Sequence, residues 1–195
     1  TVRYTLTDEN ALVLDYTATT DAPTIINLTN HSYFNLEGQS SGSMLEQTLC
    51  LNASTFTEGN AETCPTGRIL PVAGTPMDFT RAKPIGRDIQ AECSQLQMCG
   101  GYDHNFILDK EPGMLALAAV ARSEKTGITM ETYTTQPGVQ LYTSNSLQND
   151  TRTGKTGGIY GRYQGFCLET QHYPCTPSHP EFPSVELRPG EEYHE

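Results

Sequence analysis

Short segments of alternating apolar and polar residues, broken by glycine and proline, dominate this chain. In ALVLDYTA (residues 11–18), Leu12 and Leu14 point to one side and Asp15 to the other, as in a half-buried strand. Glycine and proline, 17 and 12 in number, recur at intervals too short for many long helices. The pattern predicts an all-β antiparallel sandwich with long functional loops.

Further segments extend this prediction along the chain. Strands are expected at residues 44–52, 114–122, 127–135 and 138–144, with a hairpin turn at 124–127. Residues 81–90 hint at a short helix, which their proline and glycine weaken. The stretch from residue 58 to 76 reads as a loop excursion within a domain, so we expect one domain over residues 1–195.

Charge and hydropathy exclude several classes of partner. Twelve Lys and Arg against 23 Asp and Glu give a formal net charge of -11 and a pI near 4.8, which oppose binding to nucleic acid and to anionic lipid. The most apolar piece, residues 114–121, has the length of a strand and not of a membrane span. We therefore expect neither a nucleic-acid partner nor a membrane.

Six cysteines occur at irregular spacing. A chain of this size does not need disulfides to fold, so we expect reduced thiols. His172, Cys175 and His179 resemble a loose zinc pattern, but no second Cys pair or acidic partner lies at matching intervals. We therefore expect no metal.

Four N-x-S/T sequons begin at Asn27, Asn30, Asn52 and Asn149. On a secretory route they would invite glycosylation, and a glycan on Asn30 would sit beside His31. A functional His31 therefore favours a cytoplasmic location.

One acidic residue, Glu169, lies inside an otherwise strand-like apolar segment. With alternating side chains, Phe166 and Leu168 face one way. The other face, which could line a polar groove, is formed by Cys167, Glu169 and Gln171. A solvent-exposed acid on an amphipathic strand is the alternative that periodicity alone leaves open.

His31 lies in TNHSYFNL (residues 29–36), a patch of polar and aromatic residues. Asn30 could fix the tautomer of His31, and Tyr33 could form a stacking wall of the kind that sugar sites use. A single histidine is more often structural than catalytic, so that alternative stays open.

Two further segments carry polar candidates. Asp103, in GGYDHNFIL, is either functional or a turn residue before a strand. Gln136 and Gln140 lie on either side of Pro137, and a side-chain amide can bind a hydroxyl from either end.

Four segments together resemble the aldose 1-epimerase family, of the galactose mutarotase type. They are NLTNHSYFNLEG (27–38), GYDHNFIL (101–108), YTTQPGVQLYTSN (133–145) and the stretch that begins GFCLETQHYP (165–195). The resemblance covers nearly the whole chain. It implies a large β-sandwich with a sugar site in a groove on one sheet, and an isomerase that interconverts the anomers of galactose or glucose without a cofactor.

By the same resemblance, Glu169 is the general base, His31 is the general acid, and Asp103 grips sugar hydroxyls. We expect further substrate contacts from Asn30, Tyr33 and Gln136. A noncatalytic carbohydrate-binding β-sandwich is the alternative, because one fold hosts many functions. The presence of both Glu169 and His31 favours the enzyme, because a carbohydrate-binding protein does not need an acid and a base on either side of one carbon.

The chain also departs from the family pattern. Complete members begin earlier, with a sugar-binding Arg and a further active-site His before the NHSYFN segment, and neither has a counterpart here. We therefore expect a C-terminal portion of a longer domain, apparently without its N-terminal strands and with that region as a partner. Cys175 stands where related sequences commonly have Asp.

Overall fold

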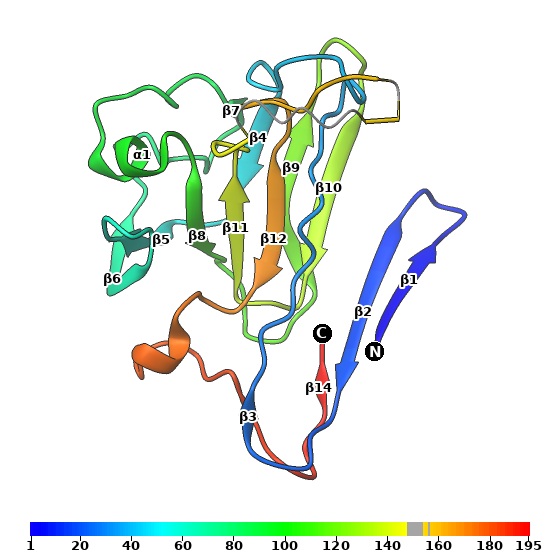
Figure 1. The fold of residues 1–195 in the computed structure, drawn as a ribbon, viewed down its shortest axis with the longest axis vertical. Coiled ribbons are helices and arrows are strands. Elements are labelled where there is room, and N and C mark those ends of the chain that lie inside the picture. Colours follow the sequence, from blue (N-terminus) through cyan, green and yellow to red (C-terminus); the bar gives the residue numbers. More distant parts are fainter. Residues whose placement is uncertain (148–153, 156) are drawn as a thin grey trace.

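The computed structural model describes residues 1–147, 154–155 and 157–195, and its strands form two main antiparallel sheets (Figure 1). One sheet has the order β10-β9-β4-β7, with strands Thr129–Thr134, Ala116–Arg122, Thr48–Leu51 and Lys83–Pro84. The other has the order β12-β11-β8-β5-β6, with strands Cys167–Gln171, Gly138–Tyr142, Asp103–Ile107, Thr55–Gly59 and Pro65–Pro71. The predicted all-β antiparallel fold is confirmed.

Apolar side chains from both sheets form one core between them. Leu49 and Leu51 on β4 and Phe106 and Leu141 on β8 and β11 are almost fully buried. Each such side chain contributes about 1.5–3 kcal/mol through burial. Alternate residues of the five-stranded sheet therefore point into the core, and the residues between them point outward.

The outward face of the five-stranded sheet carries polar side chains in cross-strand rows. Gln140 on β11 pairs with Asn105 on β8 and with Glu169 on β12. The next row consists of Asp103, Tyr142 and Cys167. Residues paired in this way point to the same face of a sheet, so β8, β11 and β12 together present a polar surface.

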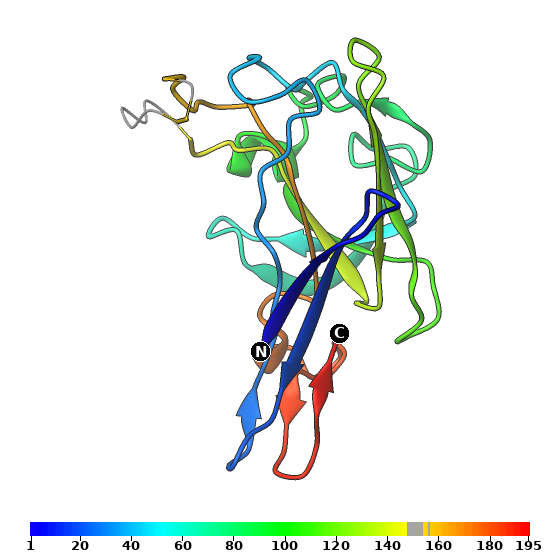
Figure 2. The same cartoon turned by 90° about the vertical axis from the view of Figure 1, so that its right-hand side faces the viewer.

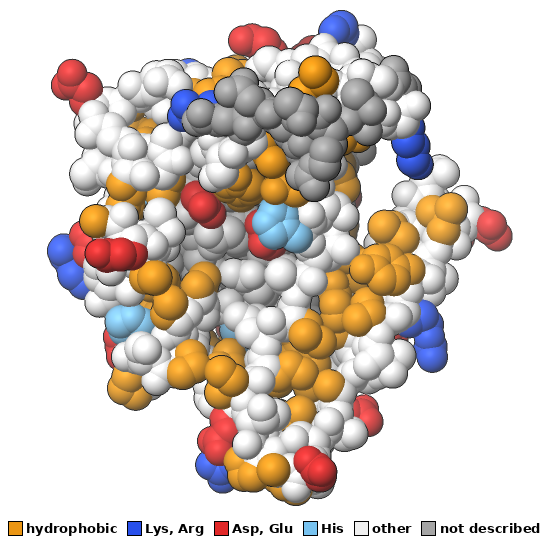
Figure 3. Space-filling model, in the orientation of Figure 1, with side chains coloured by type: hydrophobic (Ala, Val, Ile, Leu, Met, Phe, Trp, Pro, Cys, Tyr) orange, Lys and Arg blue, Asp and Glu red, His pale blue; other side chains and the backbone are white. Residues whose placement is uncertain are grey.

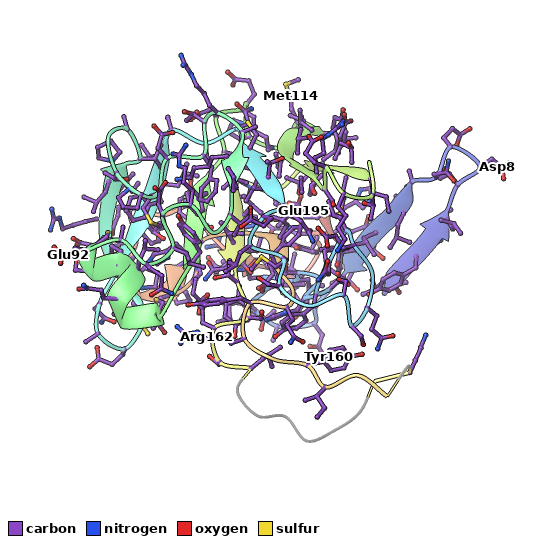
Figure 4. All side chains as sticks on the ribbon, turned by 90° about the horizontal axis from the view of Figure 1, so that it is seen from above. Asp8, Glu92, Met114, Tyr160, Arg162 and Glu195 are labelled. Carbon is purple, nitrogen blue, oxygen red and sulfur yellow. The ribbon has the colours of Figure 1, made fainter. Side chains whose placement is uncertain are left out.

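The remaining strands form an arm at one end of the molecule (Figure 2). A three-stranded sheet consists of β1 (Val2–Leu6), β2 (Leu12–Ala18) and β14 (Tyr193–His194), and a two-stranded sheet of β3 (Thr24–Ile25) and β13 (Glu186–Leu187). Viewed from above, the β1–β2 hairpin projects away from the main sheets, with Asp8 at its tip (Figure 4).

The prediction of a short helix at residues 81–90 is wrong. Lys83–Pro84 instead pair with β4, and the Lys83 ammonium group donates at 2.7 Å both to the Pro76 carbonyl and to the Asp88 carboxylate. Burying that ammonium group is tolerable only because it is paired, so tertiary contacts override the weak local preference. Among the described residues, the only α-helix is α1 (Ser94–Cys99), and none is long and apolar enough to cross a membrane.

The stretch from residue 58 to 76, predicted as a loop, contains β6. Phe56 pairs with Leu70 and Thr57 pairs with Ile69, so β5 and β6 form a hairpin. Proline and glycine in PTGRILP had hidden this strand from its sequence pattern. The other predicted strands are present with shorter bounds, and 44–52 contributes only Thr48–Leu51.

Candidate active site

His31 lies on an irregular segment that runs beside β12 (Figure 1). At one end of the segment, Asn27 exchanges hydrogen bonds with the backbone of His172, at 2.9 and 3.0 Å. At the other end, the backbones of Phe34 and Phe166 pair at 2.8 and 2.9 Å. Between these anchors the chain runs antiparallel to β12, which brings His31 over the outward face of that strand.

β12 presents Cys167 and Glu169 to His31, because residues two apart on a strand point to the same face. His31 Nε2 lies 3.5 Å from Glu169 Oε1, and His31 Nδ1 lies 3.4 Å from Cys167 Sγ. A thiol can donate to a neutral imidazole or accept from a protonated one, so Cys167 can hold the ring in both states. The His31 side chain is 51% exposed and that of Glu169 is 11% exposed, so the carboxylate lies deeper than the imidazole.

Polar and aromatic side chains surround this pair. Gln140 Nε2 donates to Asp103 Oδ1 at 2.8 Å. The Tyr33 ring stacks on His31 with centroids 5.1 Å apart, and Tyr142 meets His31 edge-on at 5.9 Å. Such rings offer an apolar face to a sugar, while the carboxylates and the amide offer hydrogen bonds to its hydroxyls.

These groups line a cavity of ≈ 290 Å³, close to the lower limit of about 300 Å³ for small-molecule sites. Figure 3 shows it as a hollow in which an imidazole lies over a carboxylate. Its lining consists of His31, Tyr33, Asp103, Gln140, Tyr142, Ser146, Glu169, Gln171 and Pro174. A larger cavity of ≈ 490 Å³, formed by residues 23–25 and members of the segment 176–186, is lined mainly by proline and other apolar residues, so we assign the chemistry to the smaller one.

Burial tunes the two carboxyl groups of the cavity. Desolvation raises the pKa of Glu169 above its ordinary value, against the opposing effect of His31, and nearby Asp103 raises it further. Desolvation also raises the pKa of Asp103, although the Gln140 amide and His31 act the other way. Burial is the largest cause of the raised pKa of Tyr33, about 12, so this phenol stays protonated. A carboxyl group with a raised pKa is a stronger base when it is ionised.

Four of the six predicted site residues line the cavity, namely Glu169, His31, Asp103 and Tyr33. The other two, Asn30 and Gln136, do not. Asn30 Nδ2 donates to the Tyr4 hydroxyl at 3.3 Å. Gln136 is buried and lies two residues before β11. Its Oε1 lies 2.8 Å from His172 Nδ1, and its Nε2 donates to the Tyr193 hydroxyl at 2.9 Å.

His104, the neighbour of Asp103, has a structural role. Its ring points into the core beside Phe56, and burial lowers its pKa to about 4, so it is neutral. Three residues of the cavity, Tyr142, Ser146 and Pro174, were missed. Alternation along β11 could have found Tyr142, which follows Gln140 on the same face, whereas Pro174 lies on a loop whose path no local pattern predicts.

The described residues contain one place where side chains could hold a metal. Among the described residues, the one group of three whose ligand atoms converge is His31, Cys167 and Glu169, with those atoms within 4.8 Å of one another. The spacing pattern of His172, Cys175 and His179 does not produce such a group. All six cysteines are free thiols.

The chain matches the aldose 1-epimerase family over residues 1–195. It is 43% identical to human galactose mutarotase over 194 residues, and 37% identical to the aldose 1-epimerase of Escherichia coli over 195 residues. These alignments cover 98% and 99% of this chain but 54% and 55% of the relatives, so the chain spans about half their length. The crystal structure of an aldose epimerase homologue from C. elegans superposes with a TM-score of 0.86 at 32% identity, covering 99% of this chain and 56% of that one.

Proposed function

Because the chain belongs to the aldose 1-epimerase family, we propose that it carries the acid–base pair of a hexose mutarotase. The reaction interconverts the α and β anomers of galactose and glucose. The observation that carries the proposal is the Glu169 carboxylate, buried and 3.5 Å from the His31 imidazole in a cavity of sugar-binding character.

The pair accounts for ring opening without a cofactor. Ionised Glu169 removes the proton of the C1 hydroxyl, the bond between C1 and the ring oxygen breaks, and protonated His31 donates its proton to that oxygen. Both oxygens are attached to C1, so one compact acid–base pair can serve both. Rotation about the C1–C2 bond then presents the other carbonyl face, and the same transfers run backwards. No net proton is consumed.

Asp103, Gln140 and the aromatic rings have the task of holding the sugar during this exchange. A carboxylate accepts hydrogen bonds from hydroxyls, and an amide both donates and accepts. Gln140 lines the cavity, and its buried carbonyl oxygen has no hydrogen-bond partner among the described residues. Fixing the ring in this way lowers the entropic cost of proton transfer.

Polarimetry of freshly dissolved α-D-galactose tests the proposal. In protein that contains residues 1–195, Glu169→Gln should lower turnover by a factor on the order of a hundred or more, because an amide cannot take the proton. Glu92→Gln makes the same chemical change at an exposed site on the molecule's edge (Figure 4) and should leave turnover unchanged.

Two outcomes would contradict the proposal. Near-normal turnover of Glu169→Gln would remove this carboxylate from the role of base. Galactose binding without any acceleration by the unmodified protein would favour the noncatalytic carbohydrate-binding alternative.

A cytosolic location is also part of the proposal, and the sequon side chains support it. The Asn27 amide donates to the His172 carbonyl, and the Asn52 amide lies 3.4 Å from the carbonyls of Asp109 and Leu117. A glycan would replace a hydrogen of each amide and disturb these contacts. The fourth sequon, at Asn149, lies outside the described residues.

A further inference from the structure

Two cysteines from distant parts of the sequence meet at one edge of the five-stranded sheet. Cys64 ends the turn between β5 and β6, where the Asn60 side chain accepts a hydrogen bond from its amide at 3.0 Å. Cys175 follows β12 and immediately precedes the short 3₁₀ helix η1 (Thr176–Ser178). Cys64 lies close enough to Cys175 to raise the pKa of its thiol.

Neighbouring contacts hold the two segments together independently of the thiols. His179 Nε2 lies 3.0 Å from the carbonyl oxygen of Pro65, the residue after Cys64. A side chain at Gly67 would collide with His179 and Glu181, at 2.9 and 2.6 Å. The start of β6 is therefore packed against the segment that begins with Cys175, and this packing keeps the two thiols close.

This pair also differs from the other cysteines in accessibility. Cys64 and Cys175 are both exposed, whereas Cys50, Cys93 and Cys99 are partly buried and Cys167 is buried. A small oxidant can therefore reach this pair more easily than any other thiol of the chain. Exposed, closely spaced thiols are the usual features of a redox-responsive pair.

We propose that Cys64 and Cys175 are a redox-responsive site that forms a reversible disulfide with a small-molecule disulfide, such as oxidised glutathione, as the oxidant. The Cys64 thiolate attacks one sulfur of the oxidant and releases one thiolate. The Cys175 thiolate then attacks the Cys64 sulfur of this mixed disulfide and releases the second. Two protein thiols lose two protons and two electrons, and one small disulfide is reduced to two thiols.

The order of attack follows from the surroundings of Cys175. Burial raises the pKa of Cys175 first, and nearby Cys64 raises it further, which lowers the fraction of Cys175 that is present as the attacking thiolate. It is therefore expected to resolve the mixed disulfide. In a reducing compartment such a bond is transient and responds to the state of the thiol pool.

The site lies beside the proposed sugar cavity. Pro174, which lines that cavity, directly precedes Cys175. A bond to Cys64 would fix this loop against the β5–β6 hairpin and so restrict one wall of the cavity. This effect on turnover rests on the proposed function, whereas formation of the bond does not.

Incubation of the protein in glutathione buffers of increasing oxidised fraction, followed by thiol counting after unfolding, tests the proposal. The count should fall from six to four, and the intact mass should decrease by two hydrogen atoms. Peptide mapping without reductant should recover the peptide of Cys64 joined to that of Cys175. Adding dithiothreitol should restore six thiols.

Single variants make the assignment specific. At the glutathione ratio that oxidises the unmodified protein, Cys64→Ser should retain all five of its thiols, and Cys175→Ser should retain four and carry an unresolved glutathione adduct on Cys64. Cys93→Ser should still lose two. A linked peptide that contains any other cysteine, or bonds only between molecules, would overturn the proposal. So would a glutathione adduct that stays on Cys64 of the unmodified protein without resolution. Polarimetry of the oxidised monomer measures the effect on turnover separately.

Discussion

Glu169 is costly to the fold for the same reason that it suits proton transfer. Its carboxylate lies on the floor of the cavity, where desolvation disfavours the charged form. Because its pKa is higher in the folded than in the unfolded chain, the folded protein binds more protons between these two values. The associated stability is fully present below the unfolded value of about 4.3 and is lost as the pH rises through the folded value.

Glu169→Gln should therefore stabilise the protein near neutral pH while it slows turnover. The amide has the same shape and carries no charge to desolvate. Each kcal/mol gained corresponds to about 2–4 °C in melting temperature for a chain of this size. Thermal unfolding monitored at pH 7 and again at pH 4 should show the gain at pH 7 and little of it at pH 4. An equal gain at both values would attribute the effect to packing instead of charge.

The pH dependence of turnover should have two limbs. Activity requires ionised Glu169, so the acidic limb of kcat/KM should lie above the ordinary glutamate value, in the direction of its raised pKa. The alkaline limb should reflect the proposed general acid, and His31→Asn should flatten that limb as well as slow the reaction. If the alkaline limb is unchanged in His31→Asn, another group is responsible for it.

The residues of the site differ in how far the sequence could place them. Glu169 was predicted to share a face with Cys167 and Gln171, and alternation on β12 does put them together. Gln136 and Gln140 have the same residue type and lie four positions apart. Their surroundings differ because β11 begins at Gly138, between the two residues. Where this strand begins depends on its pairing with β8 and β12, which the sequence of one segment does not show.

At the scale of elements, the segment that carries His31 depends on a side chain and not on a sheet ladder. Asn35 Nδ2 donates to the carbonyls of Gly42 and Gln164, at 3.1 and 3.0 Å, and its Oδ1 accepts from Gln47 Nε2 at 2.7 Å. The Asn35 amide thus connects the end of the His31 segment to the residues that precede β12. No pattern of hydrophobicity indicates such a contact.

Asn35→Ala should lower stability by about 1–3 kcal/mol, since it leaves partly buried hydrogen-bonding partners unsatisfied. It should also reduce turnover, because the segment that holds His31 is no longer fixed to the start of β12. Gln97→Ala removes an amide from an exposed position of α1 and is the matched control. Calorimetry and polarimetry of both variants check this, and equal melting temperatures would show that Asn35 is not a structural link.

Regular alternation predicted β2, β4, β9, β10, β11 and β12, because their side chains meet two different environments on the two faces. The helix α1 and the strand β6 are among the elements that were not predicted. Both are short or interrupted, and each is stabilised by partners remote in sequence: Gln95 of α1, for example, donates to the Gly59 carbonyl at 3.0 Å. Such partners cannot be read from a local window.

At the scale of the molecule, the arm leaves an apolar surface uncovered. Val2, Tyr4 and Leu6 on β1 pair with residues of β2, among them Leu12 opposite Leu6, and Leu6 and Leu12 are 79% and 59% exposed. In Figure 3, apolar side chains gather on this side of the molecule. The relatives are about twice as long as this chain.

Residues 1–195 expressed by themselves should consequently self-associate, because exposed apolar strands pair with one another. Replacing both cross-strand partners, Leu6→Lys with Leu12→Lys, should reduce the association. Leu115→Lys changes an equally exposed leucine outside the arm and should not. Analytical ultracentrifugation distinguishes the outcomes, and a monodisperse monomer of the unmodified chain would contradict the prediction.

Because the His31 segment is anchored to β12, internal motions of the protein should change the distance between the proposed acid and base little. The proposed acid and base are both attached to a single strand, one by covalent continuity and the other by the Asn27 and Phe34 contacts. Fluctuations that shift one sheet against the other therefore carry the two groups along together and change their separation little. Amide hydrogens of Phe34 and Phe166 should accordingly exchange with solvent slowly and in concert, and warming should speed the sugar chemistry until that shared unit opens.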